Sequence, residues 1–413
     1  MSERFSFVHA ADLHLDSPFR ALRADERASA ILGGATFEAF TGIVDLCLRE
    51  RAAFLALAGD LFDAKDRSVR ARLALRRELQ RLDAAGIRTF AVHGNHDPFS
   101  GEVRSLALPP SVKVFGPDWE EVQVEREGRI LCRVQGVSYG QERVTENLSR
   151  RFKRGGPEFT LGLLHANLGG EEGHANYAPC TAEELSSRGL DYWALGHVHT
   201  RAEHRLANGA LAVYPGNPQG RHVNEAGERG CVVVEVDGRA ARTRFVPLDR
   251  VRWHRLSLDV SGLADVGALA DAVERLADSL PEGPRAHAIR LSLEGRGAVH
   301  SELSIPEGRA GIEEELAQAL ATRPVPVLLE ALEDSTRPAL DPKALRDAGG
   351  LPAEVLRAAD EAHLAGAASL FPEELRNLDA KLARMGVAKV EDAAERVLER
   401  AADRAVELLV EGA

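Results

Sequence analysis

Five short polar motifs hold the residues of this chain whose types and spacing could do chemistry. Each comes at the end of an apolar, strand-like run, and together they are rich in aspartate and histidine. In chain order they are Asp12-Leu13-His14, Gly59-Asp60, Gly94-Asn95-His96-Asp97, His165 and Gly196-His197-Val198-His199. One Asp-x-His or His-x-His pair is short enough to be incidental. Five motifs in order, in a chain with 14 histidines, indicate one composite site.

The side chains in these motifs are the ligands that two adjacent divalent ions require. Carboxylates, an amide oxygen and imidazoles together suit Mn²⁺ best, with Fe²⁺, Zn²⁺ or Mg²⁺ as alternatives. A carboxylate can bridge two ions about 3.5–4 Å apart, and Asp60 is the candidate for that bridge. The neighbouring glycines let the backbone turn sharply off each strand. The predicted metal ligands are Asp12, His14, Asp60, Asn95, His165, His197 and His199.

The first 250 residues alternate between short apolar runs and amphipathic segments, a pattern typical of an α/β layered domain. Helical spacing of apolar residues occurs in the segments 37–50 and 68–82. Two further regions, 129–139 and 210–246, resemble hairpins and predict a mixed sheet. The predicted strands are 5–12, 52–60, 87–95, 159–167 and 190–198. In open α/β sheets ligands bind at the carboxyl ends of the strands, which is where the five motifs fall.

The pattern changes after Leu248. Two strands and a third around 325–332 alternate with helical segments at 263–280 and 311–322, which predicts a small α+β unit. From about Pro338 the chain is rich in Ala, Leu, Glu and Arg at helical spacing. We therefore expect three regions, a catalytic domain over 1–250, an α+β domain over 251–335 and a helical region over 336–413.

Charge is distributed unevenly between the two halves of the chain. Residues 1–250 hold 33 Lys and Arg against 34 Asp and Glu, whereas residues 251–413 hold 19 against 30. Affinity for phosphate backbones comes from Lys and Arg, so the acidic second half is a poor nucleic-acid surface. If the protein binds DNA, the first half must bind it or a partner must contribute.

Composition favours an ordinary globular protein, with 44% hydrophobic and 28% charged residues. The chain has no run of about 18 apolar residues and no signal-peptide pattern at its N-terminus, so we expect a cytoplasmic protein without a membrane span. The four cysteines, Cys47, Cys132, Cys180 and Cys231, are far apart and form no Cys-x-x-Cys pair. They are expected to be small buried residues, not a disulfide framework or zinc ligands.

The order Asp-x-His, Gly-Asp, Gly-Asn-His-Asp, His, Gly-His-x-His resembles the signature of calcineurin-like metallophosphoesterases. The versions found here, DLHLDSPF, GDLFD, VHGNHD and GHVH, are similar to those of SbcD- and YhaO-type exonuclease subunits of DNA repair complexes. The resemblance covers residues 5 to about 248, and the α+β unit is similar in arrangement to the capping domain of those nucleases. It implies a four-layer fold of two mixed sheets packed face to face and flanked by helices, then the capping domain and C-terminal helices.

The resemblance also implies roles for the site residues. One metal would be bound by Asp12, His14, Asp60 and His199, and the other by Asp60, Asn95, His165 and His197. His96 would face the scissile phosphate without binding metal, and Asp97 would hydrogen-bond and orient its imidazole. A hydroxide bridging the ions would attack phosphorus, because metals lower the pKa of bound water. The ions and His96 would stabilise the charge that develops.

Four further residues are candidates for substrate binding. His174 and Tyr177 follow His165 within GGEEGHANYAPC, and Arg221 and His222 lie in the loop YPGNPQGRHVNE. For the two histidines a solvated loop is the alternative interpretation. The basic residues of 67–81 and of RRFKR (150–154) raise a similar choice between a solvated surface and a phosphate-binding patch, with RRFKR the better candidate for the patch.

A helical apolar stripe closes the chain, formed by Val397, Leu398, Ala401, Ala405, Leu408 and Leu409. It could pack on its own domain or, by family resemblance, dock on the coiled-coil base of an SMC-like ATPase of the SbcC or YhaN type. The resemblance leaves a homodimer open.

Three functions fit these observations. The leading hypothesis is a two-metal phosphodiesterase that acts as a DNA exonuclease or endonuclease in repair. A phosphodiesterase for small nucleotide substrates shares the chemistry, and a catalytically idle scaffold of a repair complex belongs to another class. The scaffold is the weakest hypothesis, because every expected ligand position holds a competent side chain. The length beyond the catalytic domain favours a polymeric substrate.

Overall fold

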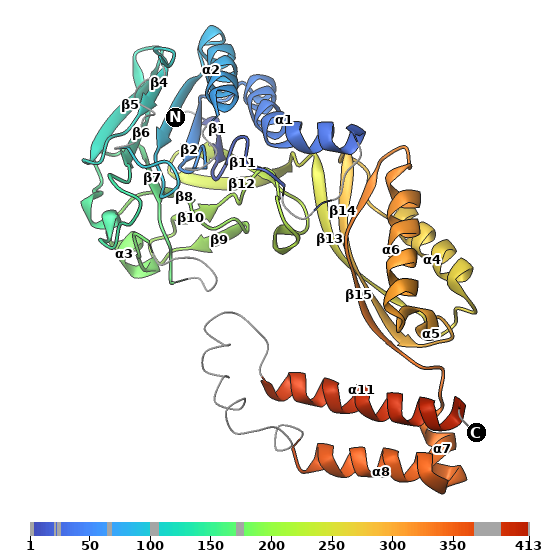
Figure 1. Ribbon diagram of the computed structural model, residues 1–413. Coiled ribbons are helices and arrows are strands. Elements are labelled where there is room, and N and C mark those ends of the chain that lie inside the picture. Colours follow the sequence, from blue (N-terminus) through green and yellow to red (C-terminus); the bar gives the residue numbers. More distant parts are fainter. Residues whose placement is uncertain are drawn as a thin grey trace. The chain divides into compact units, whose positions relative to one another are not determined.

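The computed structural model describes residues 4–19, 22, 26–63, 68–99, 107–170, 177–366 and 390–411. The chain forms two compact units. The first contains residues 1–254 with 281–289 and 323–330, and the second contains 255–280, 290–322 and 331–413. Figure 1 shows the elements of both units along the chain.

The first sheet of the first unit has six strands in the order β12-β11-β1-β2-β3-β4. The pairs β1·β2, β2·β3 and β3·β4 are parallel, whereas β1·β11 and β11·β12 are antiparallel. The sheet is therefore mixed, as predicted. Its strands are β1 (Arg4–Ala10), β2 (Phe54–Ala58), β3 (Arg88–Val92), β4 (Val112–Val114), β11 (Gly230–Asp237) and β12 (Ala240–Pro247).

The second sheet also has six strands, in the order β5-β6-β7-β8-β10-β9. Three parallel pairs, β6·β7, β7·β8 and β8·β10, lie between the antiparallel pairs β5·β6 and β9·β10. Its strands are β5 (Glu120–Arg126), β6 (Arg129–Val137), β7 (Phe159–His165), β8 (Tyr192–Gly196), β9 (Ala202–Arg205) and β10 (Leu211–Tyr214).

The two sheets pack face to face through an apolar core. Phe7, Phe54 and Phe90 of the first sheet belong to the same buried cluster as Phe159 and Tyr192 of the second. The rings of Phe7 and Phe54 stack with centroids 4.7 Å apart, and the ring of Tyr192 meets Phe7 edge-on. Aromatic and β-branched residues on facing pleats explain why these strands form a double layer.

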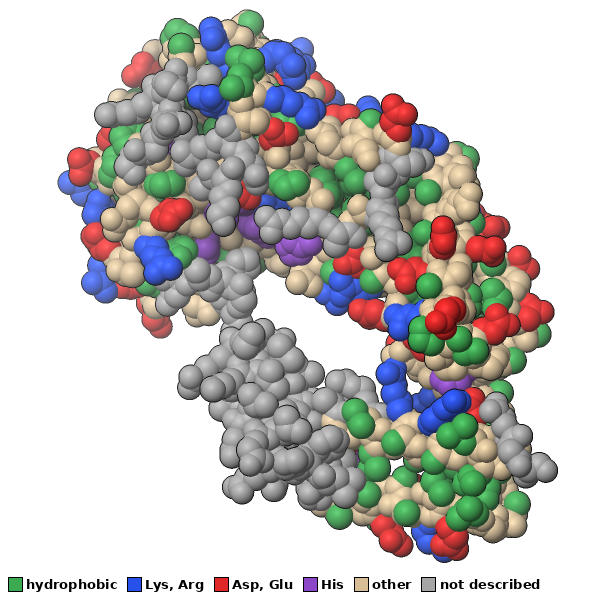
Figure 2. Space-filling view, viewed as in Figure 1, with side chains coloured by type: hydrophobic (Ala, Val, Ile, Leu, Met, Phe, Trp, Pro, Cys, Tyr) green, Lys and Arg blue, Asp and Glu red, His purple; other side chains and the backbone are tan. Residues whose placement is uncertain are grey.

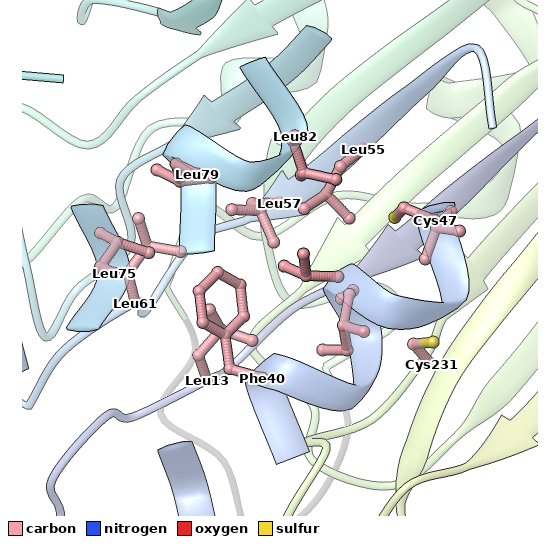
Figure 3. Close-up of a cluster of buried hydrophobic side chains, with 14 of the residues drawn as sticks. Leu13, Phe40, Cys47, Leu55, Leu57, Leu61, Leu75, Leu79, Leu82 and Cys231 are labelled. Carbon is pink, nitrogen blue, oxygen red and sulfur yellow. The ribbon is translucent and has the colours of Figure 1, made fainter. Parts of the chain in front are cut away.

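Helices α1 (Glu26–Glu50) and α2 (Val69–Ala84) cover the outer face of the first sheet. Figure 3 shows their contact with it, in which Phe40 and Cys47 of α1 and Leu75, Leu79 and Leu82 of α2 meet Leu55 and Leu57 of β2. Another apolar cluster covers the outer face of the second sheet, with contributions from α3 (Ala182–Ser187) and the 3-10 helix η2 (Leu148–Arg151). The unit thus has the four layers expected for its fold class.

The cysteines are free and buried, which confirms the prediction that they act as small apolar residues. Cys47 and Cys231 belong to one cluster, in which burial raises the pKa of both thiols. The thiols therefore stay protonated and unreactive at neutral pH.

Helix α1 is the one described helix with the length and apolar composition to cross a membrane. It begins at Glu26, eleven residues before the amphipathic segment that the sequence indicated. Eleven of its residues are buried, among them Phe40, Ile43 and Val44, which pack in the core of the first unit. Core packing accounts for its apolar character.

A third sheet has the order β13-β14-β15, with strands β13 (Val251–Asp259), β14 (Ala286–Arg296) and β15 (Val327–Arg337). Helices α4 (Val266–Asp278), α5 (His300–Leu303) and α6 (Pro306–Ala321) are interspersed with these strands along the chain. This α+β arrangement agrees with the sequence pattern. Helices α7 (Pro342–Ala348), α8 (Gly350–Leu364) and α11 (Val390–Glu411) follow it, and η3 (Val223–Glu225) is a 3-10 turn in the first unit.

Helix α11 packs against α8, but its buried face differs from the predicted stripe. Ala394, Ala402 and Val406 are buried, whereas Val397 and Leu408 of the stripe are exposed. In the second unit, α11 is held by an ion pair between Arg296 and Asp403 at 2.7 Å. The buried face of α11 also includes the acidic residues Asp403 and Glu407, which apolar spacing alone does not indicate.

Candidate metal centre

The site residues lie at the carboxyl ends of β1, β2, β3, β7 and β8; His165 is the last residue of β7, and the others lie in the loops that follow the strands. Leu13 and Leu61, which neighbour the polar residues of the first two motifs, lie in the core beneath α1 and α2 (Figure 3). The N–H of Asp12 donates to the carbonyl of Gly59, and that of His14 to the carbonyl of Asp60. The buried leucines and these bonds hold the first two motifs side by side.

Four of the predicted ligands adopt left-handed backbone conformations, Asp12 at φ 52°, His14 at 40°, Asp60 at 50° and His197 at 106°. Such conformations are rare for residues with a side chain and cost about 1–3 kcal/mol each. Gly59, at φ 90°, leaves room that a Cβ would not, because that atom would lie 2.5 Å from Nδ1 of His165. Backbone strain is therefore concentrated at this site, and the packing energy of the surrounding core must compensate for it.

Asp12, His14, Asp60 and His199 form one part of the site. Nε2 of His14 lies 3.2 Å from Nε2 of His199 and 4.0 Å from Oδ2 of Asp60. Asp12, His14 and His199 each direct one ligand atom into a common space in which all three atoms lie within 4.8 Å of one another. The Asp12 carboxylate also accepts the backbone N–H of His197.

Asp60, Asn95, His165 and His197 form the other part. Nε2 of His165 lies 3.1 Å from Oδ1 of Asn95 and 3.4 Å from Oδ2 of Asp60. The same Asn95 oxygen lies 3.2 Å from Nδ1 of His197. The structure therefore brings all seven predicted ligands together, with Asp60 reaching His14 on one side and His165 on the other.

The chemistry of these donors fits divalent cations. Nδ1 of His165 donates to the carbonyl of Ala58 at 2.9 Å, so in the neutral ring Nε2 carries a lone pair. That lone pair faces oxygens of Asn95 and Asp60, which are also acceptors. Converging buried acceptors repel one another unless a cation lies among them.

The pKa values show the same need for positive charge. Burial lowers the pKa of His165, but the neighbouring charges of Asp60 and Asp12 outweigh it and raise the pKa to about 9. Without metal, a proton on Nε2 takes the position of the cation. Burial raises the pKa of Asp12, whose carboxylate is also withdrawn from water. Metal binding would displace the proton and neutralise the carboxylates.

His96 lies beside this cluster and has a carboxylate partner that the sequence reasoning did not select. Its Nδ1–H donates to Oδ1 of Asp63 at 2.7 Å, and its ring meets the ring of His14 edge-on. The hydrogen bond to Asp63 raises the pKa of His96, while that bond in turn lowers the pKa of Asp63. His96 is therefore suited to carry a proton at neutral pH.

The prediction that Asp97 orients the imidazole of His96 is wrong. Asp97 is fully buried and accepts the backbone N–H groups of Gly94 at 2.9 Å and Leu61 at 3.0 Å. It therefore ties the loop after β3 to the loop after β2. Adjacency in the sequence suggested the pairing, but the tight turn directs the two neighbouring side chains apart. The carboxylate that does pair with His96, Asp63, is the last residue of the GDLFD motif, so the sequence did contain this residue within a recognised motif.

Glu225 is a second site residue that the sequence reasoning missed. Its Oε1 accepts Nδ1–H of His199 at 2.6 Å and its Oε2 accepts the backbone N–H of Arg221 at 2.7 Å. This bond directs Nε2 of His199 toward the other ligands, a common arrangement for metal-binding histidines. Contacts with His199, Arg221 and His222 overcome the effect of burial and lower the pKa of Glu225.

Of the four candidate substrate-binding residues, three lie within the described part of the chain. Nη1 of Arg221 lies 3.5 Å from Oδ2 of Asp63, which places its guanidinium at the site. His222 is half exposed, begins η3 and accepts the N–H of Asn224, with Nε2 3.4 Å from Glu225. The ring of Tyr177 lies 6.1 Å from that of His197. His174 lies outside the described residues.

The basic residues of the RRFKR segment make contacts within the protein. Arg150 pairs with Glu184, Arg151 with Glu146, and Arg154 with Asp191 and three backbone carbonyls. Lys153 lies over the ring of Trp119. On α2, Arg77 and Arg81 pair with Glu78, and Arg70 approaches Asp16 at 3.8 Å. In Figure 2, histidine side chains of the first unit gather in one place on the visible face.

The double sheet and its cluster of aspartate, asparagine and histidine define a metal-dependent phosphoesterase. Residues 5–201 match the calcineurin-like phosphoesterase family, and residues 253–337 match the middle domain of metallophosphoesterase YhaO. The chain is 37% identical over 297 residues to the uncharacterized metallophosphoesterase YhaO of Bacillus subtilis (strain 168), covering 70% of this chain and 72% of that protein. The chain therefore belongs to the calcineurin-like phosphoesterases of the YhaO type and is a metal-dependent hydrolase.

More distant relatives are named as DNA repair proteins. The chain is 23% identical over 314 residues to the DNA double-strand break repair protein Mre11 of Sulfolobus acidocaldarius, covering 72% of this chain and 76% of that protein. Among solved structures, TT1561 of Thermus thermophilus aligns with a TM-score of 0.37 and 14% identity, over 59% of this chain and 99% of that one.

Proposed function

We propose that this protein is a two-metal phosphodiesterase that cleaves DNA in repair. The observation that supports it best is the convergence of seven metal-binding side chains with the His96–Asp63 pair beside them. Two bound divalent ions, of which Mn²⁺ suits the ligand set, would supply Lewis acidity and lower the pKa of a bound water. One ion would be bound by Asp12, His14, Asp60 and His199, and the other by Asp60, Asn95, His165 and His197.

The protein's own residues would perform the remaining steps. Asp63 orients His96, whose other ring nitrogen then faces the substrate and stabilises negative charge on the phosphoryl oxygens or the leaving oxygen. Glu225 holds the ring of His199. The left-handed loops after β1 and β2 fix Asp12, His14 and Asp60 before substrate arrives, so little reorganisation accompanies the reaction.

DNA as substrate and repair as the process rest on the similarity to proteins named for double-strand break repair. The first half of the chain is nearly neutral and the second half is acidic. Affinity for DNA would therefore need help from a partner, for which we propose an SMC-like ATPase. A cytoplasmic location stays a prediction from the sequence.

A second candidate function is hydrolysis of small nucleotide phosphodiesters. It is favoured by the ion pairs of RRFKR, because these pairs already occupy the basic residues that were the better candidates for a polymer-binding patch. The two functions differ in substrate only, because the metal cluster and His96 serve both.

The test compares linear double-stranded DNA, single-stranded DNA and bis-p-nitrophenyl phosphate as substrates with Mn²⁺, with and without the candidate ATPase. Cleavage of DNA supports the repair nuclease. Turnover of the small ester without any DNA cleavage, even with the ATPase present, would favour the second function. Absence of turnover on all three substrates would refute both.

The first prediction concerns His96. His96→Ala should lower kcat at least about 100-fold, because general acid catalysis and charge stabilisation each contribute on that scale. Metal content, measured by elemental analysis, should stay at the wild-type level. Loss of the metals in this variant would show that His96 is a ligand and that its role is misassigned.

A further inference from the structure

Arg221 is the one charged residue at the site whose bonding is incomplete among the residues that the structure describes. Its side chain is 14% exposed, yet Nη1 approaches Asp63 only to 3.5 Å and Nη2 approaches Glu225 only to 3.7 Å. Its Nε is buried and has no hydrogen-bond partner. Buried donors are normally satisfied, so such a group points to a missing acceptor.

Neighbouring arginines show what a purely structural role looks like in this fold. Arg229, which follows in the same loop, donates to the carbonyls of Glu225, Ala226 and His199 and to the side chain of Asn217. Arg252 makes a two-pronged pair with Asp249 at 2.7 and 3.0 Å. Arg221 has neither pattern, although it is flanked by two carboxylates.

The backbone that carries Arg221 is fixed. Oε2 of Glu225 accepts the N–H of Arg221, while Gln219 donates to the carbonyl of Val251 at 2.7 Å and accepts the N–H of Arg250 at 2.8 Å. The indole of Trp253 donates to the carbonyl of Gly220 at 3.1 Å. Arg221 is therefore presented from a rigid loop, which favours a binding role over a chance surface position.

Its neighbours place the guanidinium between two functional groups. Asp63 binds His96 through Oδ1, the oxygen that does not face Arg221. Oε1 of Glu225 binds the metal ligand His199 and is also the oxygen that Nη2 of Arg221 approaches. An anion bound to Arg221 would thus lie beside both the histidine expected to face phosphate and one metal ligand. Guanidinium and phosphate match in charge and in two-pronged hydrogen-bond geometry.

We propose that Arg221 binds a non-bridging oxygen of the substrate's phosphoryl group, and that Glu225 both holds Arg221 and orients the metal ligand His199. This inference rests on the proposed function, since the phosphoryl group is that of the phosphodiester. Asp63 and Glu225 hold the guanidinium loosely in the free protein. Phosphate replaces those long contacts with short, charge-assisted bonds and supplies the missing acceptor.

The test measures binding of inorganic phosphate to the Mn²⁺-loaded protein by calorimetry, which requires no turnover. Arg221→Gln should weaken phosphate binding roughly 10- to 100-fold, the range for losing charge-assisted hydrogen bonds. Affinity for Mn²⁺ should stay within about twofold of wild type, since Arg221 is not a ligand. Arg221→Lys keeps the positive charge but loses the two-pronged hydrogen-bond geometry of the guanidinium. Its phosphate affinity should therefore fall between those of the wild type and Arg221→Gln. Arg205→Gln, on exposed β9, is the matched control and should bind phosphate as wild type.

Glu225→Gln tests whether the orientation of His199 and the position of Arg221 depend on the same carboxylate. This variant should weaken both Mn²⁺ and phosphate binding, because the orientation of His199 and the seat of Arg221 depend on one carboxylate. Wild-type phosphate binding in Arg221→Gln, or loss of Mn²⁺ in that variant, would overturn the proposal. So would absence of phosphate binding to the wild-type protein.

These outcomes are distinct from failure of the proposed function. Arg221-dependent phosphate binding without hydrolysis of any phosphodiester would support the inference and refute the function. If Arg221→Gln unfolds at the assay temperature, Arg221→Lys decides the question: phosphate affinity equal to wild type would then count against the proposal.

Discussion

At the scale of single residues, three imidazoles of the site each have a defined hydrogen-bond partner that fixes the orientation of the ring. Ala58 fixes the tautomer of His165, Glu225 that of His199, and Asp63 that of His96. Each partner occupies one ring nitrogen, so the other nitrogen is the one that would bind metal or substrate. Two of the three partners are carboxylates that come from outside the metal ligand set.

The pairing of Asp63 with His96 makes a prediction about pH. Asp63 raises the pKa of His96, so Asp63→Asn should lower that pKa. If the protonated ring is the active form, activity is lost as pH rises through this pKa, and the variant should lose it at lower pH. The measurement is kcat/KM against pH with bis-p-nitrophenyl phosphate. Asp118→Asn, an exposed change in the same unit, is the control. An unchanged alkaline limb would contradict the role of Asp63.

At the scale of elements, Asp97 connects two loops that carry ligands. Its carboxylate accepts the N–H of Leu61 after β2 and that of Gly94 after β3. We predict that Asp97→Ala leaves two buried N–H groups unsatisfied, at a cost of about 1–3 kcal/mol each. Thermal unfolding and Mn²⁺ titration should show lower stability and weaker metal binding. Asp63→Asn should keep its metal, so equal metal loss in both variants would argue against separate roles.

The core beneath α2 gives a stability prediction with an internal control. Leu79 is buried against β2, whereas Leu73 on the same helix is 55% exposed. Leu79→Ala should lower the free energy of unfolding by about 2–5 kcal/mol through lost burial and a cavity, and Leu73→Ala by less than about 0.5 kcal/mol. Denaturant unfolding of both variants measures the difference. Equal effects would show that α2 does not pack as described.

At the scale of the whole molecule, metal binding is coupled to proton release and to stability. In the metal-free protein the pKa of His165 is raised to about 9, so at neutral pH a metal must displace a proton. Affinity for Mn²⁺ should therefore rise by up to about tenfold per pH unit and level off above about pH 9. Calorimetry in buffers of different ionisation enthalpy measures the released proton. An affinity independent of pH would contradict the acceptor cluster.

Metal should also stabilise the folded state by mass action, by about 2.7 kcal/mol at a concentration 100 times the dissociation constant. The ligands belong to the first unit, and so does the strain in the loops that carry them. The seven predicted ligands all come from the first 250 residues, and the acidic second half of the chain contributes none of them.

The order of the motifs by itself determined the chemistry of this protein. Asp12, His14 and Asp60 follow apolar strands, and parallel strands end at the same edge, so their convergence could be predicted from the chain. The strand and helix alternation likewise indicated the layered fold, because periods of 2 and 3.6 residues record which face is buried. The early start of α1 was missed, since its first turns are weakly amphipathic and are held by packing.

Only the tertiary structure decided which carboxylate serves which imidazole. Asp97 is adjacent to His96 in sequence, yet a tight turn sends it to the backbone of Leu61, and Asp63 takes its place. Glu225 reaches His199 from 26 residues away, and RRFKR is paired with acids of other segments. These partners depend on which loops meet in space. Contacts between distant loops leave no periodic pattern in a single sequence, so they could not be predicted from it.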